Sequence, residues 1–254
     1  MYSSMVRGIG ALEILSRASA PLSLAEIARQ LKTSKSGTHG LLSALVRCGY
    51  AVRTSGGFYA LGLKAWEIGR SLPTDRLVRA AASVMDRLAA RVNDGVILGV
   101  LSGFEVVYVH LVGSPQAVRV HAEVGQRIPA HCTSTGLALL AVQGPAYLDH
   151  VLPKRLPAVT PETFTNVEKL KRELARIRAR GYAINRGGWD SDVGGIAVAI
   201  PADPAYGAAA LCVAVPRYRM TPHWIKDSAM SLVGASIEIA GVLPAAGSIA
   251  LVAA

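Results

Sequence analysis

A short polar and basic stretch near the start of the chain carries the side chains best suited to contact a nucleic acid. Lys35 and Ser36 open a predicted helix, where backbone N–H groups and the helix dipole favour a bound phosphate. Hydroxyl and imidazole groups along that helix suit close approach to base edges, and arginines pair with phosphate or guanine. The candidate DNA contacts are Ser34, Lys35, Ser36, Thr38, His39, Ser43, Arg47 and Arg53.

The elements that position these residues form a pattern typical of a helix-turn-helix with a hairpin wing. Residues 22–31 have apolar positions at helical spacing, with Ser23 placed as a cap, and residues 34–46 form a second predicted helix after a short polar turn. Two strand-like runs follow, around the Ser-Gly-Gly at 55–57. This arrangement sets the second helix into a DNA major groove; the alternative is an ordinary pair of surface helices.

The second helix has two distinct faces at about 100° per residue. Thr38 falls with Leu41, Leu42 and Leu45 on an apolar stripe, although it is also counted among the candidate contacts. The opposite face is small, polar and basic. It consists of Ser36, His39, Gly40, Ser43 and Arg47.

Charge is concentrated at the same end of the chain. The whole sequence has 27 Lys and Arg against 17 Asp and Glu, a net charge of +10. Residues 1–70 hold nine basic and three acidic residues, an excess of six, whereas residues 71–254 hold 18 and 14, an excess of four. A basic excess focused on one segment is the electrostatic footprint of nucleic-acid binding.

The composition excludes several classes of protein. The 254 residues suit two domains, and 51% hydrophobic residues supply a sizeable core. No run of 18 apolar residues occurs and the first eight residues lack a signal-peptide core, so no membrane segment is expected. Three widely spaced cysteines indicate reduced thiols in a cytoplasmic protein. No metal-ligand, phosphate-loop or dinucleotide motif is present, so neither a metal nor a cofactor is expected.

The remaining sequence predicts a mixed α+β domain with an antiparallel sheet. A linking helix at 63–71 precedes a break at Pro73, and Thr74 is placed to cap the next helix. Strands are expected at 96–101, 106–112, 118–124, 196–200 and 208–215, and helices at 77–92, 136–142, 167–180 and 221–242.

The polar turn at residues 131–136 is the best anchor for a small ligand in this domain. Its backbone N–H groups and the hydroxyls of Thr133, Ser134 and Thr135 precede a predicted helix and could receive a carboxylate. The alternative is plain helix capping, which is the commoner use of Ser and Thr.

In this order and spacing, the pieces resemble the IclR family of bacterial transcriptional regulators along nearly the whole chain. The similar stretches are RGIGALEIL, SLAEIARQLKTSKSGTHGLLSAL, GFYALGLKAWEIG, VGQRIPAHCTSTGLALLA, GYAI and GGIAVAIPAD. The resemblance implies a winged helix-turn-helix domain at 1–62, a linker helix at 63–73 and a GAF-like effector-binding and oligomerisation domain at 74–254. It also implies a homodimer or homotetramer on palindromic or repeated double-stranded operator DNA.

One departure from the family pattern lies in the second helix. The family usually has an Arg before the paired leucines, where this chain has Gly40, so a guanidinium for guanine or phosphate is missing. Gly37 and Gly40 also weaken the helix by roughly 1 kcal/mol each relative to Ala. Arg47, Arg53 and Lys35 are therefore expected to take more of the binding, or the operator differs.

Two further departures lie in the implied effector pocket. Asn185, Gly188 and Asp192 stand where the family has an acidic residue, a Glu and a Gly, and Cys212 and Ala214 replace two serines. A pocket with fewer hydroxyls and carboxylates favours an aromatic carboxylate or a phenol over a small keto acid. Trp189 is either a lid on this pocket or a core residue. The implied effector residues are His131, Cys132, Thr133, Ser134, Thr135, Asn185, Trp189, Gly195 and Cys212.

An enzyme is the main alternative to a regulator. His131 and Cys132 are adjacent, and a Cys–His pair can be nucleophilic, but neighbours in a strand point to opposite faces. Asp190 and Asp192 could share a strand face, although a solvated turn is the favoured interpretation. No catalytic residue is therefore assigned.

A metal site and a protein-binding winged helix are weaker interpretations of the same residues. His110 and His121 could meet near His131 as a metal site, but isolated histidines are more often structural. A winged helix that binds only proteins conflicts with the excess of six basic residues at 1–70. The sequence thus predicts a ligand-controlled transcriptional regulator, with repressor and activator both open.

Overall fold

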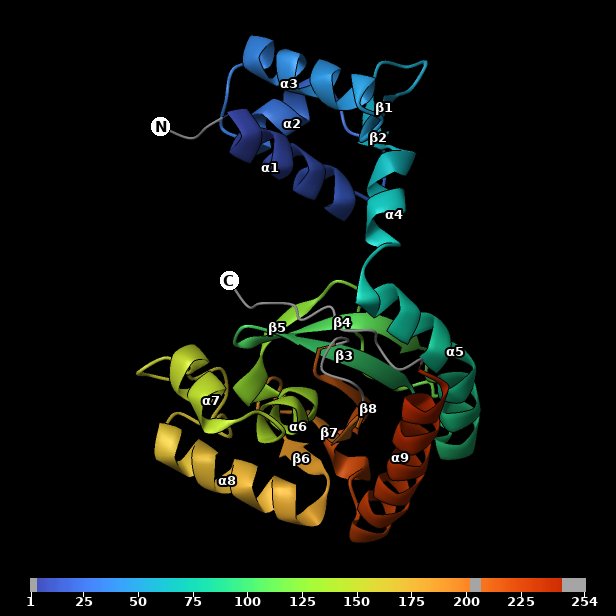
Figure 1. Cartoon of the computed structure of the whole chain (residues 1–254), viewed down its shortest axis with the longest axis vertical. Coiled ribbons are helices and arrows are strands. Elements are labelled where there is room, and N and C mark those ends of the chain that lie inside the picture. The colour runs from blue at the N-terminus through green and yellow to red at the C-terminus, as the bar shows by residue number, and fades with distance from the viewer. Residues whose placement is uncertain (1–3, 202–206, 244–254) are drawn as a thin grey trace. The chain divides into compact units, whose positions relative to one another are not determined.

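The computed structural model describes residues 4–201 and 207–243, and it divides into two compact units between Asp75 and Arg76. Figure 1 shows the elements of each unit. The apolar segment 247–254, for which the sequence indicates no role, lies outside the described residues. Among the described residues, no helix is both long and apolar enough to cross a membrane.

Unit 1 contains the predicted helix-turn-helix and wing. Its elements are α1 (Ser4–Arg17), α2 (Leu24–Gln30), α3 (Lys35–Arg47), β1 (Ala51–Arg53), β2 (Tyr59–Leu61) and α4 (Leu63–Gly69). Ser23 caps α2 as predicted, in a capping box where the Ser23 hydroxyl accepts from Glu26 N–H and the Glu26 carboxylate accepts from Ser23 N–H. Apolar residues of α1, α2, α3 and the hairpin form one buried cluster.

Unit 2 is built on a six-stranded antiparallel sheet with the order β5-β4-β3-β8-β7-β6. Its strands are β3 (Val96–Ser102), β4 (Glu105–Val112), β5 (Arg127–Pro129), β6 (Ala183–Arg186), β7 (Val193–Ala199) and β8 (Ala209–Pro216). Its helices are α5 (Pro73–Val92), whose first three residues belong to unit 1, α6 (Ser134–Ala141), α7 (Pro145–Val151), α8 (Val167–Arg180) and α9 (Pro222–Val242). The predicted α+β class with an antiparallel sheet is confirmed.

The sheet separates two hydrophobic cores. Alternate side chains of a strand point to opposite faces, so Leu98 of β3 joins α5 and α9 on one face while Ile97 joins α6 and α8 on the other. On β8, Leu211 and Cys212 divide in the same way. Figure 1 shows α5 and α9 together on one side of this unit.

Several local predictions differ from the structure. The expected strand at 118–124 is irregular, because the short β5 occupies the edge beside β4 and leaves 118–124 to pass over a cavity. Thr74 does not cap α5, because the helix already begins at Pro73, whose fixed φ suits a first helical turn. The sequence pattern did not predict α1, nor the short elements α7, β5 and β6, which are only three to seven residues long.

Candidate DNA-binding and effector sites

The outer face of α3 presents an exposed polar and basic surface. Lys35, Ser36, His39 and Arg47 are exposed, while Ser43 is half-buried. Ser34 caps the helix, since its hydroxyl accepts from Gly37 N–H at 3.1 Å. The helix sequence KSGTHGLLSALVR contains no acidic residue, so nothing on α3 itself would repel a phosphate.

Thr38 must be removed from the candidate DNA contacts. Its side chain is fully buried, and its hydroxyl donates to the Ser34 carbonyl oxygen at 2.9 Å. It therefore lies on the core side of α3 with Leu42, as the spacing of the apolar stripe indicated. A side chain without exposed surface has no access to a base edge.

The wing brings one arginine to the surface. The β1–β2 hairpin closes with Thr54 N–H donating to Phe58 O at 2.8 Å and with Gly57 at φ 80°, a left-handed conformation that favours glycine. Arg53 is exposed and its guanidinium lies 5.8 Å from the centre of the Tyr59 ring. This cation–π contact orients a guanidinium that forms no ion pair with a described residue and so suits a phosphate.

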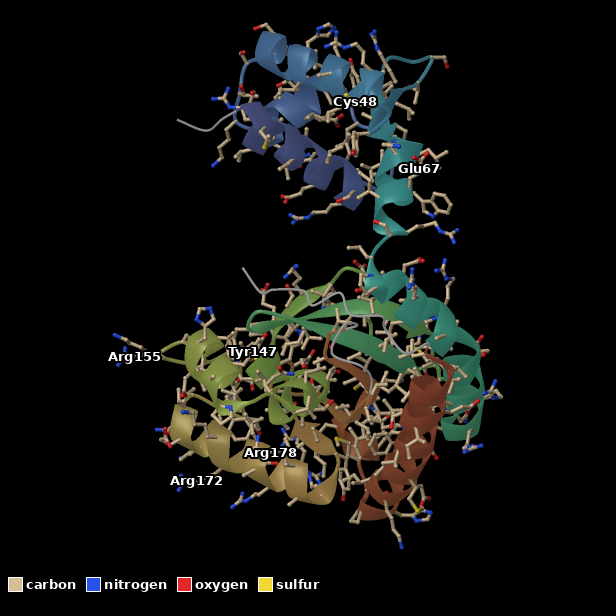
Figure 2. The ribbon with its side chains drawn as sticks, in the orientation of Figure 1. Cys48, Glu67, Tyr147, Arg155, Arg172 and Arg178 are labelled. Atoms are coloured by element: carbon tan, nitrogen blue, oxygen red, sulfur yellow. The ribbon has the colours of Figure 1, made fainter. Side chains whose placement is uncertain are left out.

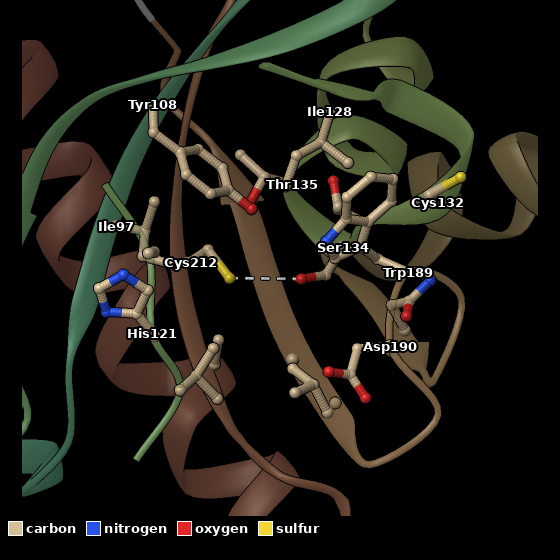
Figure 3. Close-up of a pocket in the computed structure, with 18 of the residues that line it drawn as sticks. Ile97, Tyr108, His121, Ile128, Cys132, Ser134, Thr135, Trp189, Asp190 and Cys212 are labelled. Atoms are coloured by element: carbon tan, nitrogen blue, oxygen red, sulfur yellow. Dashed lines mark hydrogen bonds between the residues drawn. The ribbon is translucent and has the colours of Figure 1, made fainter. Parts of the chain in front are cut away.

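Unit 2 contains a cavity of about 340 Å³ above the strand face that carries α6. Its walls come from β3, β4, the segment 118–122, the turn before α6, the β6–β7 connection and β8. Figure 3 shows Tyr108, Cys212 and His121 on one side and Trp189 and Asp190 on the other. A cavity of this size, whose surface is mainly apolar but whose lining includes Arg119, His121, Asp190 and Asp192, suits a small organic ligand.

The three hydroxyls at the start of α6 have three different environments. The Thr133 hydroxyl caps the helix by accepting from Gly136 N–H at 3.0 Å. The Ser134 hydroxyl lies 3.3 Å from Cys212 Sγ. The Thr135 hydroxyl is fully buried and lines the cavity near Tyr108 and Cys212, but no hydrogen bond of ordinary geometry to a described residue satisfies it. Capping therefore explains Thr133, whereas the Thr135 hydroxyl has no exposed surface and lies beside Tyr108 and Cys212 in the cavity wall.

Most of the predicted effector residues do line this cavity. Cys132, Thr133, Ser134, Thr135, Asn185, Trp189, Gly195 and Cys212 all contribute to its wall. Trp189 is 39% exposed, so it lies at the edge of the cavity and not in the core. Asn185 holds the β6–β7 connection, because its Oδ1 accepts from Gly188 N–H at 2.8 Å.

His131 does not line the cavity and must be removed from the effector set. Its ring is fully buried, stacks on Phe104 at 5.1 Å between centroids, and places Nε2 3.0 Å from the Pro157 carbonyl oxygen. Burial lowers the pKa of this imidazole, although the contact with Pro157 opposes that shift. The His131 side chain therefore packs in the core and supports the turn on the side away from the cavity.

The cavity also uses residues that were not predicted. Ile97, Tyr108 and Ile128 supply apolar walls, and Arg119 and His121 come from the irregular segment above. Burial raises the pKa of the Tyr108 hydroxyl, so the side chain is a neutral phenol at neutral pH. Most of these positions fall in or beside predicted strands, but nothing in the sequence pattern indicated that they face a cavity.

Comparison with known proteins identifies the family. The family model for the IclR helix-turn-helix domain matches residues 4–55, and the model for the bacterial transcriptional regulator IclR C-terminal domain matches residues 70–239. The chain belongs to the IclR family of bacterial transcriptional regulators. It is therefore a DNA-binding regulator, as the sequence predicted.

Individual IclR relatives match over most of their length. "Probable transcriptional regulator SauR" of Cupriavidus necator is 33% identical over 233 residues, covering 86% of this chain and 88% of that protein. An IclR homologue from Microbacterium hydrocarbonoxydans, solved with 4-hydroxybenzoate, has a TM-score of 0.83 at 30% identity and covers 94% and 98% of the two chains. The Thermotoga maritima IclR structure has a TM-score of 0.76 at 25% identity, with 94% and 97% coverage.

The geometry of the Cys–His pair differs from that expected of neighbours in a strand. His131 and Cys132 lie in a 3-10 turn, so the expectation from strand geometry was wrong: Cys132 Sγ is 3.5 Å from His131 Nε2. Burial raises the pKa of Cys132 to about 11 and lowers that of His131, which keeps the pair as a neutral thiol and imidazole. The IclR relatives are transcriptional regulators, in agreement with a non-catalytic role.

The two aspartates named in the sequence lie in a turn, and the three histidines do not gather at one site. Asp192 N–H donates to Asp190 Oδ1 at 2.9 Å in a turn, in agreement with the favoured interpretation of these two residues. Within the described part of the chain, no three His, Cys, Asp or Glu side chains gather as a metal site, so His110, His121 and His131 do not meet as one.

Proposed function

We propose that α3 and the wing of this IclR regulator bind operator DNA through Ser34, Lys35, Ser36, His39, Ser43, Arg47 and Arg53. The exposed, acid-free face of α3 is the observation that supports this assignment. Ser36 and His39 would contact base edges, whereas Lys35 and Arg53 would contact phosphates. Base contacts select a sequence, and phosphate contacts supply affinity that depends on salt.

The effector is an aromatic carboxylate or a phenol bound in the unit 2 cavity. The walls formed by Ile97, Tyr108 and Ile128 suit the faces of a ring, and the buried Thr135 hydroxyl would reach a bound ligand once the adjoining Tyr108 and Cys212 side chains shift. The start of α6 favours an anion through its first N–H groups. The 4-hydroxybenzoate in the Microbacterium homologue supports this chemical class.

The functional species is a homodimer or homotetramer. Two helices of unit 1 present large apolar side chains to solvent at spacings of three or four residues: Met5 and Ile9 on α1 are 73% and 53% exposed, and Leu63 and Trp66 on α4 are 68% and 57% exposed. Apolar residues clustered on a helix surface are typical of a protein interface. A dimer would place two α3 helices on successive major grooves.

Effector binding would control DNA binding through the placement of the subunits. The effector must bind one arrangement of the oligomer more tightly than another, and α4 (Leu63–Gly69) is the segment that transmits the difference. Release from DNA and recruitment to DNA both fit this scheme. The effector recruits the protein to DNA if the arrangement with the higher effector affinity also binds the operator more tightly. It releases the protein if that arrangement binds the operator less tightly.

A thermal-shift screen tests the proposed effector class. Benzoate, 4-hydroxybenzoate and phenol should raise the melting temperature of the wild-type protein, and Thr135→Val should reduce that rise. Pyruvate and glyoxylate serve as small keto-acid controls. Stabilisation by the keto acids but by no aromatic compound would contradict the proposal.

A further inference from the structure

Helix α8 and the segments next to it carry a concentration of positive charge in unit 2, separate from the basic residues of the DNA-binding unit. Residues 150–186 contain nine Lys and Arg against three Asp and Glu, an excess of six, which equals the excess at residues 1–70. The rest of residues 76–254 contains nine basic and ten acidic residues. The positive charge of this unit is therefore local to α8 and the segments next to it.

The basic residues of α8 follow one exposed face. Lys169, Arg172 and Arg176 lie at spacings of three and four residues, which places them in a row about 10 Å long. We call these three residues the α8 row. Lys169 and Arg172 have no ion-pair partner in the described part of the chain, and Arg176 is 74% exposed, with a loose contact of 3.6 Å to Glu173.

Neighbouring cations extend the row. Lys154 and Arg155 follow α7, are exposed and form no ion pair within the described residues, and α7 is tied to α8 by the ion pair between Asp149 and Lys171 at 3.0 Å. Figure 2 shows Arg155 and Arg172 with their guanidinium groups directed away from the ribbon. Such uncompensated cations repel one another unless an anion binds beside them.

The chemistry of this surface favours DNA over a protein. The exposed α8 residues other than the row are Glu168, Ala175, Arg178 and Ala179, so the helix offers no large apolar or aromatic anchor of the kind that protein interfaces need. Phosphates require only cations, and the planar guanidinium of arginine matches their geometry. This regulator already binds a long polyanion, which continues beyond the operator on both sides.

We propose that the α8 row is a second, sequence-independent contact with DNA, and that it binds the phosphate backbone of the duplex flanking the operator. This inference rests on the proposed operator binding by α3. The operator would then be bound by α3 with sequence preference, and the flanking duplex by α8 without it. The contribution of α8 would grow with the length of the flanks until the row is fully occupied.

The test compares wild-type protein and Lys169→Gln/Arg172→Gln on two duplexes with the same operator, one with minimal flanks and one extended by about three helical turns. Arg91→Gln/Lys226→Gln is the matched control, because it removes one Arg and one Lys from α5 and α9 of the same unit, both exposed and neither in an ion pair with a described residue. Circular dichroism and melting temperature establish that all three proteins fold.

The proposal predicts a length-dependent loss. On the long duplex the α8 variant should bind roughly tenfold more weakly than wild type, and the slope of log K against log salt should fall by about 1.8. On the short duplex the α8 variant and wild type should bind alike, and the control should match wild type on both.

Two results would overturn the assignment of α8 to DNA. One is equal affinity of wild type and the α8 variant for the long duplex, which would favour an acidic protein as the partner of the α8 row. The other is an equal loss on both duplexes, which would indicate a general effect of net charge. Failure of wild-type protein to prefer the operator over unrelated DNA would instead refute the function proposed for α3.

Discussion

The starts of α3 and α6 use the same local chemistry in opposite surroundings. Ser34 caps α3 by accepting from Gly37 N–H at 3.1 Å, and Thr133 caps α6 by accepting from Gly136 N–H at 3.0 Å. The first cap is exposed beside Lys35, whereas the second is buried beside the cavity of unit 2. Both helix starts attract anions, but burial decides which anion can reach them.

The difference in burial shows how a capped helix start can suit two kinds of ligand. An exposed helix start in water gains little from each charge contact, so it needs several cations and a large polyanion, and salt weakens it. A buried helix start can bind one small molecule, since each unsatisfied polar group there is costly to leave without a partner. In the proposed function, operator and effector binding follow from these two surroundings.

The largest expected effect comes from adding a methyl group to a glycine in each helix. A Cβ at Gly136 would lie 2.1 Å from the Ala130 carbonyl oxygen, whereas a Cβ at Gly40 meets nothing within 4 Å. Gly136→Ala should therefore lower the free energy of unfolding of its unit by about 3 kcal/mol. Gly40→Ala should raise that of unit 1 by about 1 kcal/mol. Urea denaturation checks both, and equal signs would show that the two environments are not as different as described.

The next effect concerns the two threonines before and within α6. Thr135→Val removes the unsatisfied buried hydroxyl and should weaken binding of 4-hydroxybenzoate roughly tenfold, with little change in stability. Thr133→Val removes the cap and should cost about 1 kcal/mol of stability. Calorimetric titration and urea denaturation separate the two outcomes. Unchanged ligand affinity in Thr135→Val would remove this hydroxyl from the effector site.

A smaller effect is expected for single cations of the DNA-binding unit. Lys35→Ala and Arg53→Ala should each weaken operator binding across all sequences and reduce the salt slope by about 0.9. Ser36→Ala and His39→Ala should instead change the preferred operator sequence. Anisotropy titrations at several salt concentrations measure both, with Arg91→Ala as control. If neither Lys35→Ala nor Arg53→Ala changed affinity or slope, the docking of α3 and the wing would be wrong.

The smallest effect is a pH dependence of stability in unit 2. Burial lowers the pKa of His131 below its ordinary value of 6.5 in the folded protein, so the unfolded chain binds this proton more readily. The free energy of unfolding should therefore decrease as the pH falls through and below 6.5. His131→Gln should reduce that decrease. Urea denaturation at pH 7.5 and 5.5 provides the comparison, and an identical pH dependence in the variant would exclude His131 as its source.

The sequence predicted those parts of the molecule whose signals are local. Caps and helical spacing predicted α2, α3, α8 and α9, and the glycines at 56 and 57 indicated the wing. The burial of Thr38 also followed from its place on the apolar stripe. Local patterns could not show that residues 127–129, and not the strand expected at 118–124, pair with β4, because strand pairing is decided by tertiary competition.

The candidate effector site was predicted less completely, for the same reason. The turn at 131–136 was visible as a run of polar residues before an apolar helix. The family resemblance placed His131 in the site, but Phe104 and Pro157, which are distant in sequence, hold its ring in the core. Tyr108 was missed because a strand pattern shows which residues alternate, not which face has a cavity.

The most direct test of the two-site account is a titration of the DNA upstream of the protein's own gene, with and without 4-hydroxybenzoate, for wild type and Thr135→Val. The account predicts salt-sensitive binding that exceeds binding to an unrelated duplex. It also predicts a change in wild-type affinity on adding the ligand, and a much smaller change in Thr135→Val at the same ligand concentration. Specific DNA binding that responds equally to the ligand in both proteins would contradict the buried start of α6 as the effector site.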